Sequence, residues 1–126
     1  MKTHLHLPDA EFCIMQIVWS QPTPISKTQV SELAEPLRGW TPQTVYTLLN
    51  RLTEKKFLST EKHGKERYYS PLIAQAEYLN QETGRFMKMF HQNSLTGLMN
   101  ALYAGDSPNE QDLLELEQWL REKKSE

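Results

Sequence analysis

Six side chains that can form hydrogen bonds recur at helical spacing between residues 43 and 51 of this 126-residue chain. They are Gln43, Thr44, Tyr46, Thr47, Asn50 and Arg51. The amides of Gln and Asn can pair with adenine through two hydrogen bonds, Arg can pair with guanine or a phosphate, and Thr offers its methyl group to thymine. This chemistry suits recognition of duplex DNA, although the same residue types also occur on ordinary solvated helix faces.

A second polar group surrounds Gly64 and is mainly basic. It consists of Lys62, His63, Lys65 and Arg67, within a segment (51–67) that carries six basic and three acidic residues. Basic groups at the tip of a turn fit contacts with phosphates, and a glycine there permits close approach of the backbone. An ordinary solvated turn would have a similar composition. The composition alone therefore does not distinguish such a turn from one that contacts phosphates, and the order of the two polar groups along the chain is needed as well.

Residues for catalysis or metal binding form no pattern. Sequence spacing links none of the four histidines, His4, His6, His63 and His91, to a nucleophile or carboxylate. We expect the first two to lie in a frayed N-terminus. Cys13 is the single cysteine, which excludes an internal disulfide and a cysteine-based zinc site within one chain, and we interpret it as a small core residue. The expectation is no enzyme activity, no cofactor and no functional metal site.

Helix signals divide the first 56 residues into three helical segments. Residues 8–19 begin with acidic residues that suit a first helical turn. Ser26 and Thr41 have the properties of N-caps, the first within a capping box and the second followed by proline. The segments that they open are expected to end near residues 36–39 and near Lys56.

The third helical segment separates apolar from polar residues. Its apolar residues Val45, Leu48, Leu49 and Leu52 follow the i, i+3, i+4, i+7 pattern of one buried face. At 100° per residue, the residues most nearly opposite are Gln43, Thr47, Asn50 and Glu54. The polar group named above is therefore expected on the outward face, with Glu54 near the helix end and outside a DNA groove.

Two short β-prone runs follow, at 57–60 and 67–70, with a polar turn at 61–66 between them. Three helices followed by a β-hairpin form the winged helix-turn-helix plan. In that plan the third helix enters the major groove and the hairpin contacts the backbone or minor groove beside it. The order of the elements therefore favours DNA binding for both polar groups.

Residues 72–126 are predicted to form three amphipathic helices, at 74–92, at 94–104 and after a capping box that begins at Ser107. Their large apolar residues include Tyr78, Phe86, Met89, Phe90, Leu95, Leu98, Met99, Leu102, Leu113, Leu116, Trp119 and Leu120. Such faces need a partner, and a symmetric homodimer supplies one together with two recognition helices. The alternative is that these helices pack back on the N-terminal domain.

The formal charge of −2 is the average of two different halves. Residues 1–70 have a net charge of +2 and residues 71–126 a net charge of −4. This balance excludes affinity for DNA based on bulk positive charge, and it keeps open a second class of function, a winged-helix module for protein–protein interaction with little DNA affinity. Without a bilayer-spanning apolar run or a signal-peptide core, we expect no membrane partner and a cytoplasmic location.

Three stretches, LPDAEFCIMQIVW, WTPQTVYTLLNRLTEKKFL and RYYSPL, resemble the penicillinase-repressor family, also called BlaI/MecI/CopY, in a resemblance that covers residues 5–122. The resemblance implies a homodimeric repressor that binds an operator with dyad symmetry. It carries DNA contacts over to Gln43, Thr44, Thr47 and Arg51. The cysteine-rich metal motif of the copper-responsive branch is absent. The β-lactam-responsive branch implies a sensor protease as a further partner, acting near residues 100–102, although the residues there differ from the usual bond.

These observations combine into one expected architecture. The fold class is mainly α with a small β-hairpin: a winged helix-turn-helix DNA-binding domain at 1–71, followed by a helical dimerisation domain at 72–126. The expected function is that of a sequence-specific transcriptional repressor that binds double-stranded DNA at a palindromic operator.

Overall fold

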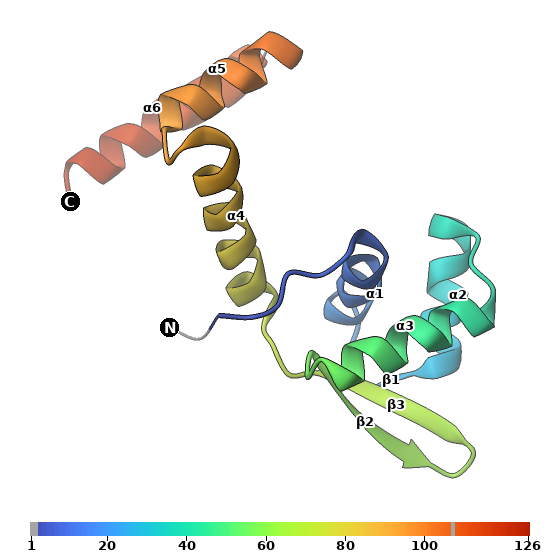
Figure 1. Ribbon diagram of the computed structural model, residues 1–126. Helices are drawn as coiled ribbons and strands as arrows, with labels where there is room; N and C mark the ends of the chain where they lie inside the picture. Colours follow the sequence, from blue (N-terminus) through green and yellow to red (C-terminus); the bar gives the residue numbers. More distant parts are fainter. Residues whose placement is uncertain (1–2, 107) are drawn as a thin grey trace. The chain divides into compact units, whose positions relative to one another are not determined.

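The computed structural model describes residues 3–106 and 108–126, and the chain divides into two compact units, Met1–Glu82 and Thr83–Glu126. We call them the N-terminal unit and the C-terminal unit. The predicted winged helix-turn-helix fold and the helices that follow it are both present (Figure 1). The division by compactness lies beyond the boundary predicted after Pro71, because the first turns of the next helix group with the N-terminal unit.

Three helices frame the N-terminal unit: α1 (Asp9–Trp19), α2 (Lys27–Arg38) and α3 (Pro42–Glu54). Both predicted N-caps are confirmed, because Ser26 Oγ accepts a hydrogen bond from Gln29 N and Thr41 Oγ1 accepts one from Thr44 N. Gly39 ends α2 with a φ of +67°, a left-handed conformation that suits glycine after a helix. The α2–α3 connection is therefore short and defined by local chemistry at both ends.

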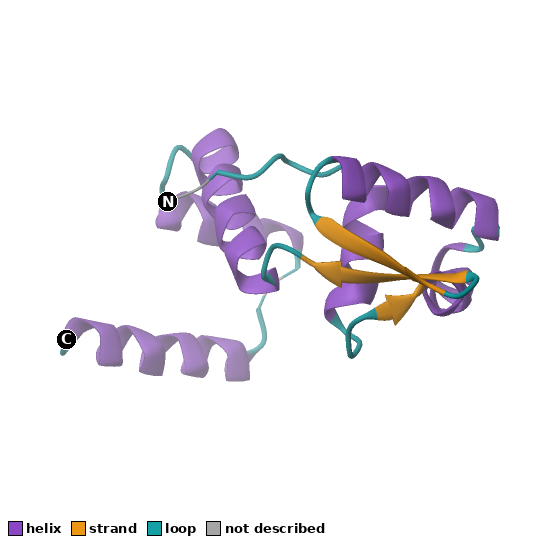
Figure 2. Ribbon diagram, turned by 90° about the horizontal axis from the view of Figure 1, so that it is seen from below, coloured by secondary structure: helices purple, strands orange, loops and turns teal. Residues whose placement is uncertain are grey.

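A three-stranded antiparallel sheet completes the winged helix (Figure 2). Its strands are β1 (Ile25–Ser26), β2 (Leu58–His63) and β3 (Glu66–Pro71), in the order β1-β3-β2. The predicted hairpin is formed by β2 and β3, but its strands are longer than expected and leave only Gly64 and Lys65 in the turn. The strand β1 was not predicted, because a two-residue strand has no alternation for a sequence pattern to reveal.

The predicted apolar face of α3 is buried in the core of the N-terminal unit. Its residues Val45, Leu48, Leu49 and Leu52 are at most 5% exposed and pack with buried residues of α1, α2 and the sheet. This burial fixes the rotation of α3 about its own axis, and with it the direction in which the polar face of the helix points.

The prediction that Tyr78 takes part in dimerisation is wrong, because its side chain is already buried within one chain. The residue is 2% exposed and belongs to the core of the N-terminal unit. Its ring centroid lies 5.8 Å from that of Phe12, 6.0 Å from that of Trp19 and 5.6 Å from that of Phe57. The amphipathic pattern showed that Tyr78 is buried, but a pattern within one helix cannot show which surface covers it.

Three further helices follow the sheet: α4 (Gln75–His91), α5 (Leu95–Gly105) and α6 (Glu110–Lys124). The helix α4 begins in the N-terminal unit and ends in the C-terminal unit. Ser107, predicted as the cap of the last helix, lies outside the described residues; the N-cap of α6 is Asn109, whose Oδ1 accepts a hydrogen bond from Asp112 N. Within the described ranges, no helix combines the length and apolarity required to cross a bilayer.

Candidate nucleic-acid interface

The solvent side of α3 carries the hydrogen-bonding residues that the sequence placed there. Gln43, Thr47, Asn50 and Arg51 are exposed, and we call this group the α3 ridge. Thr44 beside it is exposed as well. The side chains of Gln43, Asn50 and Arg51 take part in no hydrogen bond or ion pair within the described parts of the chain. The hydrogen-bonding groups of these three side chains are therefore available to a partner.

The two threonine hydroxyls on α3 already have partners. Thr47 Oγ1 donates a hydrogen bond to the backbone oxygen of Gln43 at 3.1 Å, and Thr44 Oγ1 lies 3.2 Å from Thr41 Oγ1. A hydroxyl bonded back to its own helix is satisfied without a ligand. Thr47 therefore offers mainly its methyl group, which fits an apolar contact with thymine.

Tyr46 differs from the other candidate residues because it is half-buried. The Nζ atom of Lys27, the first residue of α2, lies 3.8 Å from the centroid of the Tyr46 ring. This cation–π contact joins the start of α2 to the flank of α3. Tyr46 thus has a packing role that the sequence did not indicate, and Lys27 is held at the edge of the polar surface.

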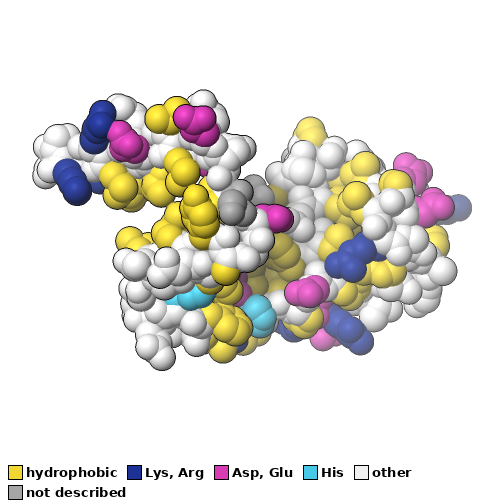
Figure 3. Space-filling view, turned by 90° about the horizontal axis from the view of Figure 1, so that it is seen from above, with side chains coloured by type: hydrophobic (Ala, Val, Ile, Leu, Met, Phe, Trp, Pro, Cys, Tyr) yellow, Lys and Arg dark blue, Asp and Glu magenta, His cyan; other side chains and the backbone are white. Residues whose placement is uncertain are grey.

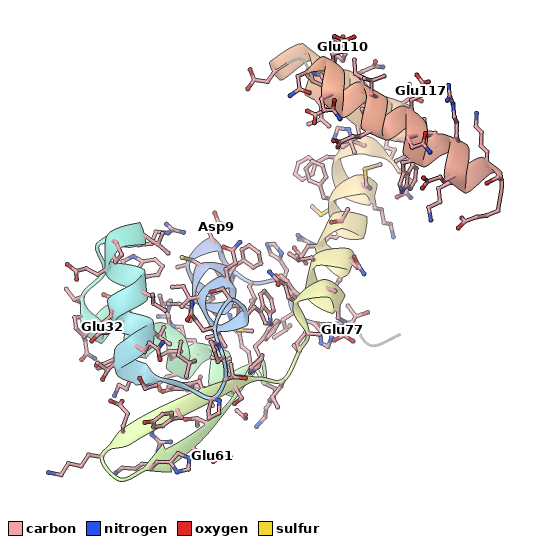
Figure 4. All side chains as sticks on the ribbon, turned by 180° about the vertical axis from the view of Figure 1, so that it is seen from behind. Asp9, Glu32, Glu61, Glu77, Glu110 and Glu117 are labelled. Atoms are coloured by element: carbon pink, nitrogen blue, oxygen red, sulfur yellow. The ribbon has the colours of Figure 1, made fainter. Side chains whose placement is uncertain are left out.

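The hairpin of β2 and β3, here called the wing, exposes all four of its predicted contact residues: Lys62, His63, Lys65 and Arg67. Gly64 turns the chain with a φ of +66°, a conformation that side chains with a Cβ rarely adopt. His63 Nε2 lies 3.1 Å from Oε2 of Glu61, and its ring packs edge-on against Tyr68 at 5.3 Å (Figure 4 labels Glu61). His63 is therefore occupied within the wing, whereas neither lysine of the wing forms a hydrogen bond or ion pair with the described residues.

A shallow groove joins the end of α3 to the wing. It is lined by Asn50, Thr53, Glu54, Thr60, Arg67 and Tyr69. Arg67 Nη1 donates a long hydrogen bond of 3.4 Å to Thr60 Oγ1. Burial raises the pKa of the Tyr69 phenol above its usual value, although a hydrogen bond with Thr60 and the charge of Arg67 act in the opposite direction. The groove places both predicted polar groups on adjoining surfaces, and it includes Glu54, which the sequence placed outside the site.

Two contacts that position this surface have no signal in the sequence. Thr28 Oγ1 on α2 donates a hydrogen bond to Oε2 of Glu66, the first residue of β3 after the turn of the wing, at 2.7 Å. Lys55 Nζ, at the end of α3, lies 2.6 Å from Oε1 of the buried Glu11 on α1. Both pairs are separated by more than 35 residues, so only the folded chain brings the partners together. The first holds the wing against α2, and the second holds the end of α3 against α1.

The C-terminal unit exposes large apolar side chains (Figure 3). Phe86, Met89, Phe90, Leu95, Leu102, Leu113, Trp119 and Leu120 of the predicted dimerisation set are exposed, whereas Leu98, Met99 and Leu116 are half-buried. An almost wholly apolar groove is lined by Leu95, Thr96, Met99, Leu116, Trp119 and Leu120 from α5 and α6. Apolar surface of this kind indicates a protein partner.

Metal-binding chemistry has no counterpart in the described ranges, because no three side chains of His, Cys, Asp or Glu come together there to hold an ion. Cys13 is a free, half-buried residue of α1.

Comparisons with known proteins agree with this geometry. The family model described as penicillinase repressor matches residues 7–122. The penicillinase repressor of Bacillus licheniformis is 27% identical over 99% of this chain and 97% of its own length. The methicillin resistance regulatory protein MecI of Mammaliicoccus sciuri is 22% identical over 93% of this chain and 94% of its own length.

Two solved structures resemble the winged helix. The DNA-binding domain of the repressor BlaI matches with a TM-score of 0.54 and 31% identity, over 62% of this chain and 94% of that domain. The monomeric form of Bacillus licheniformis BlaI in complex with the blaP half-operator matches with a TM-score of 0.53 and 31% identity, over the same shares of both chains. Because the family model matches most of this chain, the chain belongs to the penicillinase-repressor (BlaI/MecI) family, whose members are winged-helix DNA-binding repressors and not enzymes.

Proposed function

We propose that this chain represses transcription as a homodimer that binds an operator with dyad symmetry. The observation that carries the proposal is the α3 ridge, an exposed row of side chains that can contact base edges. The opposite face of the same helix is buried in the core. A winged helix that docks only to proteins would not require this set of residues. The BlaI complex with a half-operator supports the same mode of binding here, because this chain shares its winged-helix fold.

The α3 ridge supplies direct contacts with base edges in the major groove. Gln43 and Asn50 are suited to adenine, and Arg51 to guanine or to a phosphate. Thr47 presents its methyl group to thymine, because its hydroxyl is bonded to the helix. Thr44 and Tyr46 contact the DNA backbone at the flank of the ridge. Each good bidentate contact discriminates against the wrong base by about 1–3 kcal/mol.

The wing supplies affinity that does not depend on sequence. Lys62, Lys65 and Arg67 are exposed on one hairpin, and Lys62 pairs with Arg67 across the two strands, so their charges are close together. Cations that neutralise phosphates release condensed counterions, so binding weakens as the salt concentration rises. His63 contributes less than the other wing residues because Glu61 and Tyr68 already engage it.

The exposed apolar side chains of the C-terminal unit supply the dimer interface. Trp119, Leu120 and Leu95 line a groove that offers almost no polar atoms, which suits the same surface on a second copy of the chain. Two copies bring two α3 ridges to two half-sites, and this explains how a chain whose net charge is only −2 obtains specificity.

The family resemblance adds one element to the proposal, which is that a sensor protease cuts the repressor and so releases it from its operator. Residues 100–102 lie within α5, between Met99 and the α6 residues that complete the apolar groove. A cut there would separate the two sides of the groove along the chain. Cleavage at this point would therefore abolish dimerisation while leaving the winged helix whole.

Selection of DNA by the full-length protein tests the proposed function. The protein is incubated with a pool of randomised duplexes, the bound duplexes are sequenced, and the affinity of the best sequence is measured by fluorescence anisotropy beside a scrambled duplex. We expect an inverted repeat, bound at least about 10³-fold more tightly than the scrambled duplex at physiological salt. A pool without enrichment, or equal affinity for both duplexes, would contradict the proposal.

A further inference from the structure

From the sequence we expect a frayed N-terminus, and this expectation is wrong. The described residues before α1 lie along the beginning of α4. His4 N donates a hydrogen bond to Gln81 Oε1 at 2.7 Å, and Gln81 Nε2 donates one to the backbone oxygen of His4 at 2.8 Å. The side-chain amide of Gln81 therefore satisfies both backbone groups of a single residue that is 77 positions away. We call the segment 3–7 the strap.

Three further contacts attach the strap to the same helix. Leu7, which is 2% exposed, donates its backbone N–H to the hydroxyl oxygen of Tyr78 at 2.8 Å. His4 Nε2 lies 3.0 Å from Oε2 of Glu77, which Figure 4 labels at the start of α4, and His6 Nδ1 forms a hydrogen bond with Oε1 of Glu82. The strap thus holds α4 by polar contacts along its length and by a buried anchor at its end.

The α4 residues that hold the strap lie on one side of that helix. Glu77, Tyr78, Gln81 and Glu82 occupy positions i, i+1, i+4 and i+5, which share one face over two helical turns. A single contact would leave a helix free to pivot. Contacts over two turns, together with Tyr78 in the core, restrict both the tilt of this part of α4 and its rotation about its own axis.

We propose that the strap is a positioning device that determines which separation of two operator half-sites the repressor prefers. The helix α4 continues without a break from the part held by the strap to His91, within the C-terminal unit. It is therefore the covalent path from each reading unit to the dimer interface. Restricting its first turns restricts the distances and angles at which two α3 ridges can be presented. This inference rests on the proposed function, since it requires a dimer that reads two half-sites.

Gln81→Glu removes the donor to His4 O and places a carboxylate against that oxygen, with almost no change in side-chain size. Asn80→Asp is the matched control, because it adds the same charge at the preceding position of α4, where the side chain is exposed and makes no hydrogen bond with the described residues. Gln81→Leu removes both bonds without adding a charge. Gln81→Glu keeps an oxygen that can accept from His4 N, so hydrogen exchange of the full-length protein should show the His4 amide exchanging about tenfold faster in Gln81→Leu and unchanged in the control.

The functional readout is a series of inverted repeats of the selected half-site, in which the spacer is lengthened or shortened by single base pairs. The wild type and Asn80→Asp should favour one spacing. In both Gln81 variants the affinity for that spacing, relative to its neighbours, should fall by about fivefold. Affinity for a duplex with a single half-site should stay the same in all four proteins, because the strap does not touch the α3 ridge.

Faster exchange with an unchanged spacing preference would overturn the inference, as would unchanged exchange of the His4 amide in Gln81→Leu. A loss of affinity for the single half-site in these variants would also overturn it, because the strap would then act on reading itself. Failure of the wild-type protein to bind any half-site would instead contradict the proposed function, so the two failures are distinguishable.

Discussion

Replacing Lys55 with methionine should destabilise the N-terminal unit more than replacing its partner Glu11 with leucine. The two side chains form an ion pair with a separation of 2.6 Å between Lys55 Nζ and Glu11 Oε1. The side chain of Glu11 is 4% exposed and that of Lys55 is 30% exposed. Loss of the lysine leaves a carboxylate buried without its cation, whereas loss of the carboxylate leaves a lysine that can extend into water.

The magnitudes follow from this difference in exposure. Removing one partner of a fully buried ion pair costs about 3–5 kcal/mol of unfolding free energy. Because water reaches Lys55, we expect about 2–3 kcal/mol for Lys55→Met. Glu11→Leu should cost about 1 kcal/mol, the value of one ordinary hydrogen bond. The double variant should recover most of the loss, because two apolar side chains of similar volume replace the pair.

Urea unfolding at a single protein concentration measures these differences. A Trp119→Phe background leaves Trp19 and Trp40 as fluorescent reporters, and both lie in the N-terminal unit. Lys56→Met is the control, because this neighbouring lysine is exposed and has no ion pair among the described residues; its effect should stay within about 0.5 kcal/mol. Equal losses for the two single variants, with a loss in the double variant equal to their sum, would show that Glu11 and Lys55 are not coupled as a buried ion pair.

Three further results are expected. Arg51→Ala should weaken binding to the selected duplex and reduce the slope of log affinity against log salt by about one, as measured by fluorescence anisotropy over a salt series. Loss of the dimer in sedimentation would show that Arg51 supports dimerisation and not DNA binding. A chain that ends at Glu82 should fold and sediment as a monomer, whereas one that ends at Pro71 should lose cooperative unfolding because Tyr78 is missing from the core; a dimeric fragment would contradict the assignment of the C-terminal helices. Because burial raises the pKa of Tyr69 in the folded state, its contribution to stability is complete below about pH 10 and is lost as the pH rises through the raised pKa. Tyr69→Phe should therefore reduce the alkaline fall in unfolding free energy, measured by urea unfolding from neutral pH upward, and an identical fall in both proteins would contradict this.

Features that depend on neighbouring residues were predictable from the sequence. The caps at Ser26 and Thr41 act over three residues, so their chemistry is visible in the chain. The apolar face of α3 repeats at a helical period, so the periodicity alone places the α3 ridge opposite it. For this reason the predicted winged helix and the exposure of Gln43, Asn50 and Arg51 are confirmed.

Features that depend on distant partners were not predictable. The strand β1 exists because Ile25 pairs with Tyr69, and the wing is held by Glu66 and Thr28. Tyr78 was assigned to the dimer interface because helical periodicity indicates that a residue is buried, but not which other residues cover it. The histidines of the strap looked unconstrained for the same reason, since their partners lie more than 70 residues away.

The most direct test of the central claim compares the DNA motif selected by the wild type with the motif selected by Asn50→Ala. We expect an inverted repeat for the wild type, and the same repeat for the variant except that base preference is lost at one position in each half-site. Lys65→Ala, as a comparison, should select an unchanged motif and bind every sequence more weakly. An Asn50→Ala motif identical to that of the wild type would show that Asn50 does not read a base, and a wild-type motif without dyad symmetry would contradict binding as a symmetric dimer.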